Sequence, residues 1–240
     1  MQTEHTVKSF DEELKRLSDM VAQMGGLAEA QLQAAIEALV GRDAEQAARI
    51  VQGDGRIDQL ERQISSHTVR LLALRQPMAV DLREIVAALK ISSDIERIGD
   101  YAANVAKRAI ALTQSPPMRP VGGIARMGRL VQQIIKDTLD AYGAHDAEKA
   151  IAAWKRDQEV DDMYNSLFRE LLTYMMEDPR NIGPSTHLLF IAKNIERIGD
   201  HATNVAEIIH FLVRGEDIVE ARPKSDKTSF AVVNAPEEKA

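Results

Sequence analysis

The segment NIERIGDHATNVAE, Asn194 to Glu207, repeats a segment found one hundred residues earlier, DIERIGDYAANVAK, Asp94 to Lys107. Aligned from Ile91 and Ile191 over seventeen positions, the two copies agree at eleven, where chance would give about one agreement. Repetition at this level is typical of a fold built from two copies of one unit. The residues that both copies keep therefore indicate what each unit needs.

The repeat also reaches backwards along the chain. GRDAEQAARIVQGDGRID, residues 41–58, matches AHDAEKAIAAWKRDQEVD, residues 144–161, and the match keeps three aspartates: Asp43, Asp54 and Asp58 coincide with Asp146, Asp157 and Asp161. Two glycines in the first copy would each cost about 1 kcal/mol inside a helix and favour a break. The second copy has Arg156 and Gln158 at those positions. We therefore expect the helix to continue in both copies, with a kink in the first.

The composition favours an all-α protein. The chain has 240 residues, of which 45% are hydrophobic and only 4% aromatic, so leucine, isoleucine, valine, methionine and alanine must form the core. This palette suits packing of helix on helix better than packing of sheets. The net charge of −7 argues against a nucleic-acid partner, and the absence of cysteine excludes disulfides and thiolate metal sites. No apolar run is long enough to span a bilayer and no signal peptide is recognisable, so we expect a cytoplasmic protein.

Apolar residues recur at helical spacing along most of the chain. Proline, glycine and capping residues divide it into six expected helices, at residues 8–40, 43–75, 77–112, 124–142, 146–177 and 184–213. The predicted architecture is two tandem pseudo-repeated three-helix bundles. The expected parts are a first repeat at 1–112, a proline and glycine linker at 113–123, a second repeat at 124–214 and a disordered tail at 215–240.

The repeated segment carries an apolar seam and a polar stripe. The seam steps by four and three residues, as in a helical bundle, through Ile91, Ile95, Ile98, Ala102 and Val105, and the second copy steps in the same way. The retained polar residues lie about 140° to 220° around the helix from that seam. They are Glu96, Asp100 and Asn104 in one copy and Glu196, Asp200 and Asn204 in the other. We expect each stripe to face away from the core.

Carboxylate and amide oxygens at this spacing suit a divalent or trivalent cation such as magnesium, manganese, calcium or iron. A neighbouring helix should add ligands, and the candidates are Asp58 and Glu61, or Asp161 and Asp162. Gly99 and Gly199, both inside helices, indicate a close approach by another group. Two other interpretations stay open: the stripe meets basic residues of a partner protein, or it is a solvated helix face with an ion pair between Arg97 and Asp100.

Three motifs resemble the PhoU family over about residues 8–218: RQPMAVDLR at residues 75–83, the doubled IERIGD, and the closing GEDI at residues 215–218. The family consists of accessory and regulatory proteins of bacterial phosphate uptake, and its fold is two three-helix bundles. The resemblance implies a negative regulator of the phosphate-starvation response, coupling the phosphate ABC transporter to a membrane-bound sensor histidine kinase. The second copy has EDPRNIGP, residues 177–184, where the first has RQP, so any role of that motif belongs to one half.

The resemblance also implies a cofactor. Some members bind multinuclear iron or zinc clusters through an E/D-x-x-x-D motif, which here is Glu96 with Asp100 and Glu196 with Asp200, whereas others carry no metal. We therefore expect iron, zinc, manganese or magnesium, if a metal binds. A regulatory adaptor without catalysis, active as a homodimer, is the preferred interpretation. The alternatives are a carboxylate-bridged metal-dependent enzyme and a metal-binding helical scaffold. No glycine-rich phosphate loop or nucleophile motif supports the enzyme.

Overall fold

The structure is a computed structural model that describes the backbone of residues 2–220 and the side chains of residues 10–220. Every regular element in that range is helical, as the sequence predicts. The elements are α1 (Gln2–Gly41), α2 (Ala44–Gly53), α3 (Gly55–Arg75), α4 (Ala79–Leu112), α5 (Val121–Ala144), α6 (Ala147–Lys155), α7 (Asp157–Glu177), the short 3-10 helix η1 (Pro179–Asn181) and α8 (Ile182–Arg214). No helix between residues 2 and 220 is long and apolar enough to cross a membrane.

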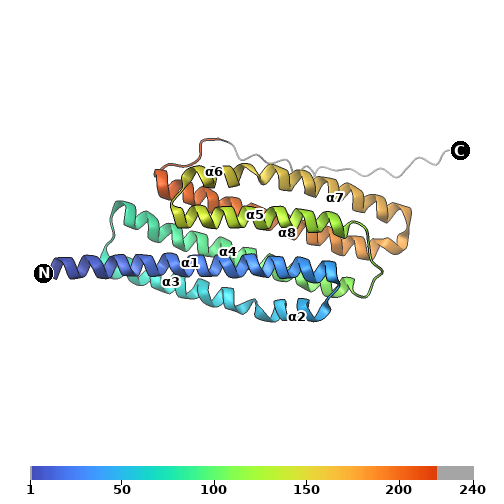
Figure 1. The fold of residues 1–240 in the computed structure, drawn as a ribbon, viewed down its shortest axis with the longest axis horizontal. Coiled ribbons are helices and arrows are strands. Elements are labelled where there is room, and N and C mark those ends of the chain that lie inside the picture. The colour runs from blue at the N-terminus through green and yellow to red at the C-terminus, as the bar shows by residue number, and fades with distance from the viewer. Residues whose placement is uncertain (1, 221–240) are drawn as a thin grey trace.

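The two repeats lie side by side along the long axis of the molecule (Figure 1). The first repeat contains α1 to α4 and the second contains α5 to α8. Each repeat therefore corresponds to a three-helix unit in which the second helix is divided in two, as α2 and α3 or as α6 and α7. Helices α2 and α3 form one edge, and α6 and α7 form the opposite edge (Figure 1). Helices α4 and α8 pack most extensively against each other, and α1 and α5 pack against both repeats. One continuous core therefore joins the two halves.

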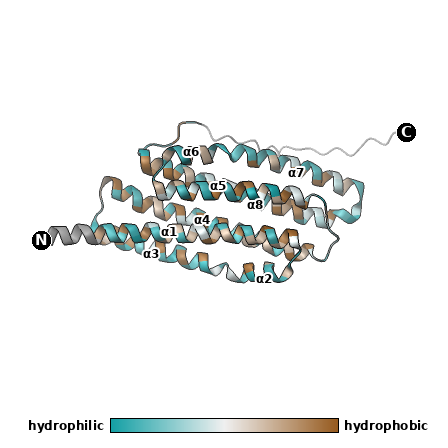
Figure 2. Cartoon of the chain, in the orientation of Figure 1, coloured by the Kyte–Doolittle hydropathy of each residue, from teal (hydrophilic) through white to brown (hydrophobic). Residues whose placement is uncertain are grey.

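Helix α4 is central because it is apolar on more than one face. The predicted seam is buried, with Ile91, Ile95 and Ile98 each at most 2% exposed. A second buried row runs through Ser92, Gly99 and Ala103. Brown and teal alternate along most helices in Figure 2, with no helix wholly of one kind. A helix with two apolar faces has neighbours on most sides, so little of its surface reaches solvent.

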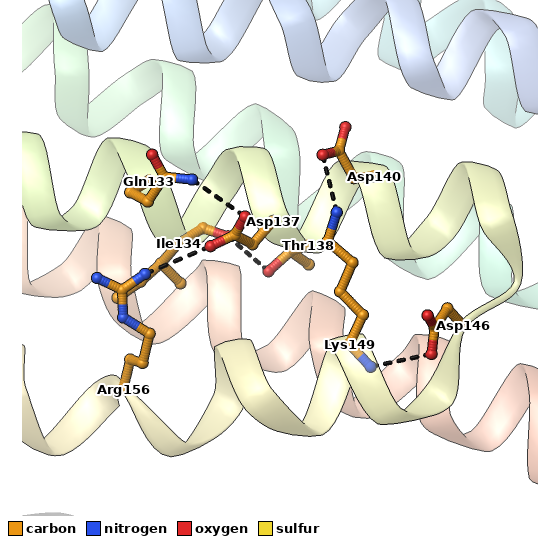
Figure 3. Close-up of polar contacts among 8 residues, drawn as sticks. All are labelled: Gln133, Ile134, Asp137, Thr138, Asp140, Asp146, Lys149 and Arg156. Carbon is orange, nitrogen blue, oxygen red and sulfur yellow. Dashed lines mark hydrogen bonds and ion pairs between the residues drawn. The ribbon is translucent and has the colours of Figure 1, made fainter.

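The prediction of a continuous second helix in each repeat is wrong. In the first copy a turn at Asp54 separates α2 from α3, and in the second a turn at Arg156 separates α6 from α7. The break in the second copy has no glycine to explain it. There the Arg156 guanidinium reaches back to the Asp137 carboxylate of α5, at 3.3 Å. This contact is tertiary, so the local sequence gave no sign of it (Figure 3).

Helices α2 and α6 begin where the sequence predicts. The Asp43 carboxylate accepts a hydrogen bond from the backbone N–H of Gln46 at 2.8 Å, and Asp146 does the same for Lys149 at 3.0 Å. Both are N-caps, which satisfy a backbone donor that the first helical turn leaves free. The Lys149 side chain also pairs with Asp140 of α5 at 2.9 Å, which ties α6 to its neighbour (Figure 3).

Several helix boundaries differ from the prediction by two residues or more, among them the starts of α1, α4, α5 and α8. The last linker residues already belong to a helix, because α5 begins at Val121, three residues earlier than expected. Helix α8 ends at Arg214, where Gly215 adopts a left-handed φ of 78°, and residues 215–220 are not helical. Most of the expected disordered tail, residues 221–240, lies outside the described residues.

Candidate metal centre

The polar stripe of each repeat lies beside a neighbouring helix, and the expectation that it faces away from the core is wrong. Along α4 the outward positions are Ser93, Arg97 and Lys107, all of which are exposed. Glu96 and Asp100 are half-buried, and Glu196 of α8 is only 5% exposed. The predicted angle around the helix between the apolar seam and the polar stripe does not account for this error. The error arose because α4 and α8 have further neighbours, α3 and α7, on the side of the stripe.

The glycines of the repeated segment explain how closely these neighbours approach. A Cβ added to Gly99 would lie 2.8 Å from Cδ1 of Ile57 in α3. A Cβ on Gly199 would lie 3.3 Å from Cγ1 of Val160 in α7. The close approach that the glycines predicted is therefore packing of the edge helix. That packing brings acidic residues of α3 and α7 beside the stripe.

In the first repeat three carboxylates from two helices come together. Oxygen atoms of Asp58, Glu96 and Asp100 all lie within 4.8 Å of one another, and all three residues are half-buried. Cation–oxygen bonds of about 2.0 to 2.6 Å place ligand oxygens at such separations from one another. We call these three residues the first acidic cluster. Its residues come from two helices, α3 and α4. One helix alone would offer too few ligands for a metal site.

A glutamine from α1 supports the first acidic cluster. The Gln31 amide nitrogen donates to the Asp54 carboxylate at 2.7 Å and to the Gly99 carbonyl at 3.0 Å. Asp54 in turn acts electrostatically on Asp100 and helps to raise its pKa. Sequence reasoning missed Gln31 and Asp54 as site residues. Asp54 is an aspartate in both copies of the repeat, a signal that was available, whereas nothing in the sequence identified Gln31.

The charges of the first acidic cluster oppose one another. Burial raises the pKa of Glu96, and the neighbouring Asp100, Asp58 and Glu61 carboxylates raise it further. Burial likewise raises the pKa of Asp100, with Asp54 the next contributor. Arg97 is the nearby cation, 3.6 Å from Glu96 and 3.4 Å from Asp100, but its side chain is 57% exposed. Exposed ion pairs contribute little, so the cluster retains unbalanced negative charge.

The second repeat neutralises its carboxylates from within. Glu196 lies near Asp161, which is 3% exposed, and near Asp200. The Lys193 ammonium is 2.8 Å from Oε1 of Glu196 and lies over the Tyr164 ring, 4.8 Å from its centre. We call Glu196, Asp200 and Asp161 the second acidic cluster. The pKa of Glu196 is still raised, chiefly by burial, and its Oε2 accepts no hydrogen bond.

The remaining candidates are divided between these clusters and other contacts. Glu61 lies near enough to act on Glu96 electrostatically, whereas Asp162 is exposed. Asn104 accepts a hydrogen bond from Lys107 at 3.3 Å on its own helix. Asn204 donates to Asp94 of the other repeat, at 3.3 Å. Sequence reasoning did not identify Lys193 as a site residue. It also passed over Asp157, the first residue of α7, which is 2% exposed.

His201 of α8 joins the two repeats. Its Nδ1 is 2.7 Å from the Asp94 carboxylate, and its ring stacks on Tyr101, with 5.7 Å between ring centres. Its partner is thus an aspartate of α4 and not Asp200 beside it. These contacts place His201 in the interface between α4 and α8, which argues against its use as a metal ligand.

The donor set of the first acidic cluster fits a hard cation. It consists of carboxylate oxygens alone, half-buried, with raised pKa values, and the cations that act on it, Arg97 and Lys107, are exposed. Such a set suits magnesium, manganese, calcium or iron, and it suits zinc less because no nitrogen or sulfur ligand joins it. Asp58, Glu96 and Asp100 would hold the ion, which would neutralise their charge and bind α3 to α4.

Comparison with known proteins identifies the family. The PhoU domain family matches this chain twice, at residues 21–109 and 124–209. The chain belongs to the PhoU family. The two matched segments correspond to the two repeats, so the tandem architecture is a PhoU architecture. This confirms the resemblance inferred from the RQP, IERIGD and GEDI motifs.

Individual PhoU proteins are similar over nearly the whole chain. The phosphate-specific transport system accessory protein PhoU homolog of Caulobacter vibrioides is 57% identical over 228 residues, which cover 95% of this chain and 99% of the relative. The crystal structure of PhoU from Pseudomonas aeruginosa matches with a TM-score of 0.84 and 41% identity, covering 86% of this chain and 100% of that one. The phosphate transport system regulatory protein PhoU from Streptococcus pneumoniae matches with a TM-score of 0.81 and 31% identity, covering 87% and 99%. These PhoU proteins are named as accessory and regulatory proteins.

Proposed function

We propose that this PhoU protein is a cytoplasmic regulator of phosphate homeostasis that represses the phosphate-starvation response when phosphate is plentiful. The observation that carries the proposal is similarity over nearly the entire chain to proteins named as accessory and regulatory components of phosphate transport. In this proposal it couples the phosphate ABC transporter to a sensor histidine kinase. Long helices with exposed faces provide the contact surfaces, and a homodimer is the expected state.

Deletion of the gene tests the regulatory role. In phosphate-rich medium the deletion should raise expression from a phosphate-starvation promoter, and a copy of the wild-type gene should restore repression. Expression that stays low in the deletion strain would overturn the proposal. Crosslinking followed by mass spectrometry in the complemented strain tests the partners: crosslinks to the transporter and to the kinase are expected, and a specific crosslink to neither would contradict the coupling.

We further propose that the first acidic cluster binds a divalent or trivalent metal ion. Support comes from three carboxylate oxygens within 4.8 Å of one another and from the raised pKa values of Glu96 and Asp100. Equilibrium dialysis against manganese, followed by elemental analysis, should find one ion per chain. The matched variants are Asp100→Asn and Asp200→Asn. Loss of the ion in the first and its retention in the second would place it in the first repeat.

A metal-dependent enzyme is the alternative function that the carboxylate cluster brings to mind. It requires a substrate pocket beside the metal, and a reacting group within reach of the substrate. Assay of phosphate-ester hydrolysis with manganese-loaded protein distinguishes the two. Turnover that disappears in Asp100→Asn would favour the enzyme, whereas the regulatory adaptor predicts none.

A further inference from the structure

A hollow of about 390 Å³ lies between the first half of α4 and the last turns of α8. Four of its lining residues follow one face of α4 at helical spacing, and the others come from α8 and the segment after it. They are Arg83, Val86, Ala87, Lys90, Glu207, Ile208, Phe211 and Asp217. The hollow shares no residue with either acidic cluster, and the proposed metal centre does not use it.

Two cations that line this hollow, Arg83 and Lys90, form no ion pair with any residue whose side chain the structure describes. The Nε of Arg83 is buried and makes no hydrogen bond. Among the residues that the structure describes, no carboxylate lies within 4.0 Å of the Arg83 or Lys90 side-chain nitrogens. A buried donor without an acceptor is unfavourable, and more so when the group is charged. The unpaired Nε therefore shows that no acceptor in the described part of the chain completes this edge of the Arg83 guanidinium.

The two carboxylates of the hollow form no ion pair with these cations. Oε1 of Glu207 accepts a hydrogen bond from the Trp154 indole N–H at 2.7 Å, which directs it toward α6. Asp217 is exposed and lies three residues beyond the end of α8. The remaining walls are apolar, from Val86, Ile208 and Phe211. A cation in such surroundings attracts an anion more strongly than it would on an open surface.

The backbone after α8 holds the Arg83 guanidinium in place. Gly215 has a φ of 78°, and a Cβ added there would lie 2.7 Å from Nη1 of Arg83. The contact between Nδ1 of His210 and the Glu216 carbonyl, at 3.1 Å, fixes the next residue of the segment. The guanidinium is thus packed against main chain, with its orientation set before any ligand arrives.

We infer that this hollow binds a small phosphate-type oxyanion, held by the Arg83 guanidinium and the Lys90 ammonium. The arginine presents a planar fork of N–H donors, and the lysine adds a mobile point charge from two turns further along α4. A phosphate group has more oxygens and more negative charge than a carboxylate, so it interacts more strongly with both cations at once. The apolar walls leave room for an organic group, so inorganic phosphate and a small phosphate ester share the recognition chemistry.

Both cations of the site come from the first repeat. At the offset of one hundred residues that relates α4 to α8, Arg83 corresponds to Gly183 and Lys90 to Phe190. The second repeat therefore offers no equivalent pair of cations. The inference goes beyond the proposed regulatory function and does not depend on the metal site.

Titration calorimetry of the full chain, freed of metal by chelation, tests the site. Phosphate, glycerol 3-phosphate and acetate are compared at constant ionic strength. Saturable 1:1 binding of phosphate or of its ester is expected, with the stronger of the two identifying the source, and acetate should bind at least tenfold more weakly. Arg83→Gln should weaken binding at least tenfold and Lys90→Gln several-fold, whereas Arg16→Gln, an exposed cation of α1 that does not line the hollow, should have no effect.

Asp217→Asn is a second variant, and its expected effect on phosphate affinity has the opposite sign. Removing the exposed carboxylate that faces the hollow should tighten phosphate binding several-fold, because it removes repulsion without touching a donor. It also keeps the test informative if Arg83→Gln fails to fold. The inference is overturned if neither phosphate compound binds saturably below 10 mM (about 2.7 kcal/mol of binding free energy). It is also overturned if Asp217→Asn and Lys90→Gln both bind like the wild type.

Discussion

The two acidic clusters occupy corresponding places in the two repeats but balance their charge in different ways. In the second, the Lys193 ammonium pairs with Glu196 and rests on the Tyr164 ring. In the first, the corresponding positions are Ser93 and Glu61, a neutral residue and a further carboxylate. The second cluster therefore carries an internal cation, whereas the cations near the first, Arg97 and Lys107, are exposed. Duplication preserved the carboxylates, and the residues around them decided what neutralises the charge.

Removing the internal cation should have the largest effect. Lys193→Met leaves Glu196, which is 5% exposed, without its ion-pair partner. We expect a loss of about 2 kcal/mol in the free energy of unfolding at pH 7.5, because a buried charge without its partner is strongly unfavourable. Chemical denaturation measures it. The loss should shrink at pH 5.5, since Glu196 can then take up a proton. An undiminished loss at pH 5.5 would attribute the effect to packing on Tyr164.

Removing one carboxylate of the first acidic cluster should abolish tight metal binding. In Asp100→Asn the dissociation constant for manganese should rise at least tenfold, about 1.4 kcal/mol, because one of three anionic ligands is lost. Asp200→Asn, at the corresponding position of α8, is the matched control and should bind as the wild type does. Equal losses in both variants would show that the two clusters bind metal alike, which would break the comparison.

Neutralising Glu96 should stabilise the metal-free protein. The raised pKa of Glu96 means that the native state holds its proton more tightly than the unfolded chain does. Stability therefore falls as pH rises from the unfolded pKa through the native one, and the full penalty is present above both. At pH 7.5, Glu96→Gln should raise the stability by about 1 kcal/mol or less, roughly 2 to 4 °C in melting temperature.

The advantage of Glu96→Gln should disappear as the pH approaches 4.5, the ordinary pKa of glutamate. Glu170→Gln, at an exposed position of α7, is the control and should leave the melting temperature nearly unchanged. If Glu96→Gln lowers the melting temperature of chelated protein at pH 7.5, the first acidic cluster is not strained by its own charge.

Transplanting the internal cation should have the smallest effect on stability. Ser93 is exposed and lies three residues before Glu96, so Ser93→Lys reproduces the spacing of Lys193 and Glu196. The new pair should add a few tenths of a kcal/mol to the metal-free protein. It should also weaken manganese binding several-fold, measured by equilibrium dialysis. Ser93→Gln is the uncharged control. Unchanged manganese affinity in Ser93→Lys would show that a lysine at this position does not compete for the cluster.

The sequence by itself determined the helical class, the tandem repeat and the buried seam of α4 and α8. These features depend on hydrophobic periodicity and on similarity between the two copies. Both can be read from the order of residues without knowledge of three-dimensional contacts. Local pattern also found the candidate carboxylates, Glu96 and Asp100, and offered Asp58 as a partner. It placed them correctly around their helix, about 180° from the seam.

The tertiary structure alone decided what surrounds those carboxylates. Periodicity identifies one core-facing side of a helix, but the number of neighbours is a property of the whole assembly, so the sequence treated a half-buried stripe as an outward face. Gln31 and Lys193 escaped notice for the same reason, since their importance depends on contacts with residues of other helices or with a buried carboxylate. The contact of Arg156, at the break between α6 and α7, with Asp137 likewise joins residues nineteen positions apart. Charge balance and helix breaks are set by through-space contacts, which a single sequence does not record.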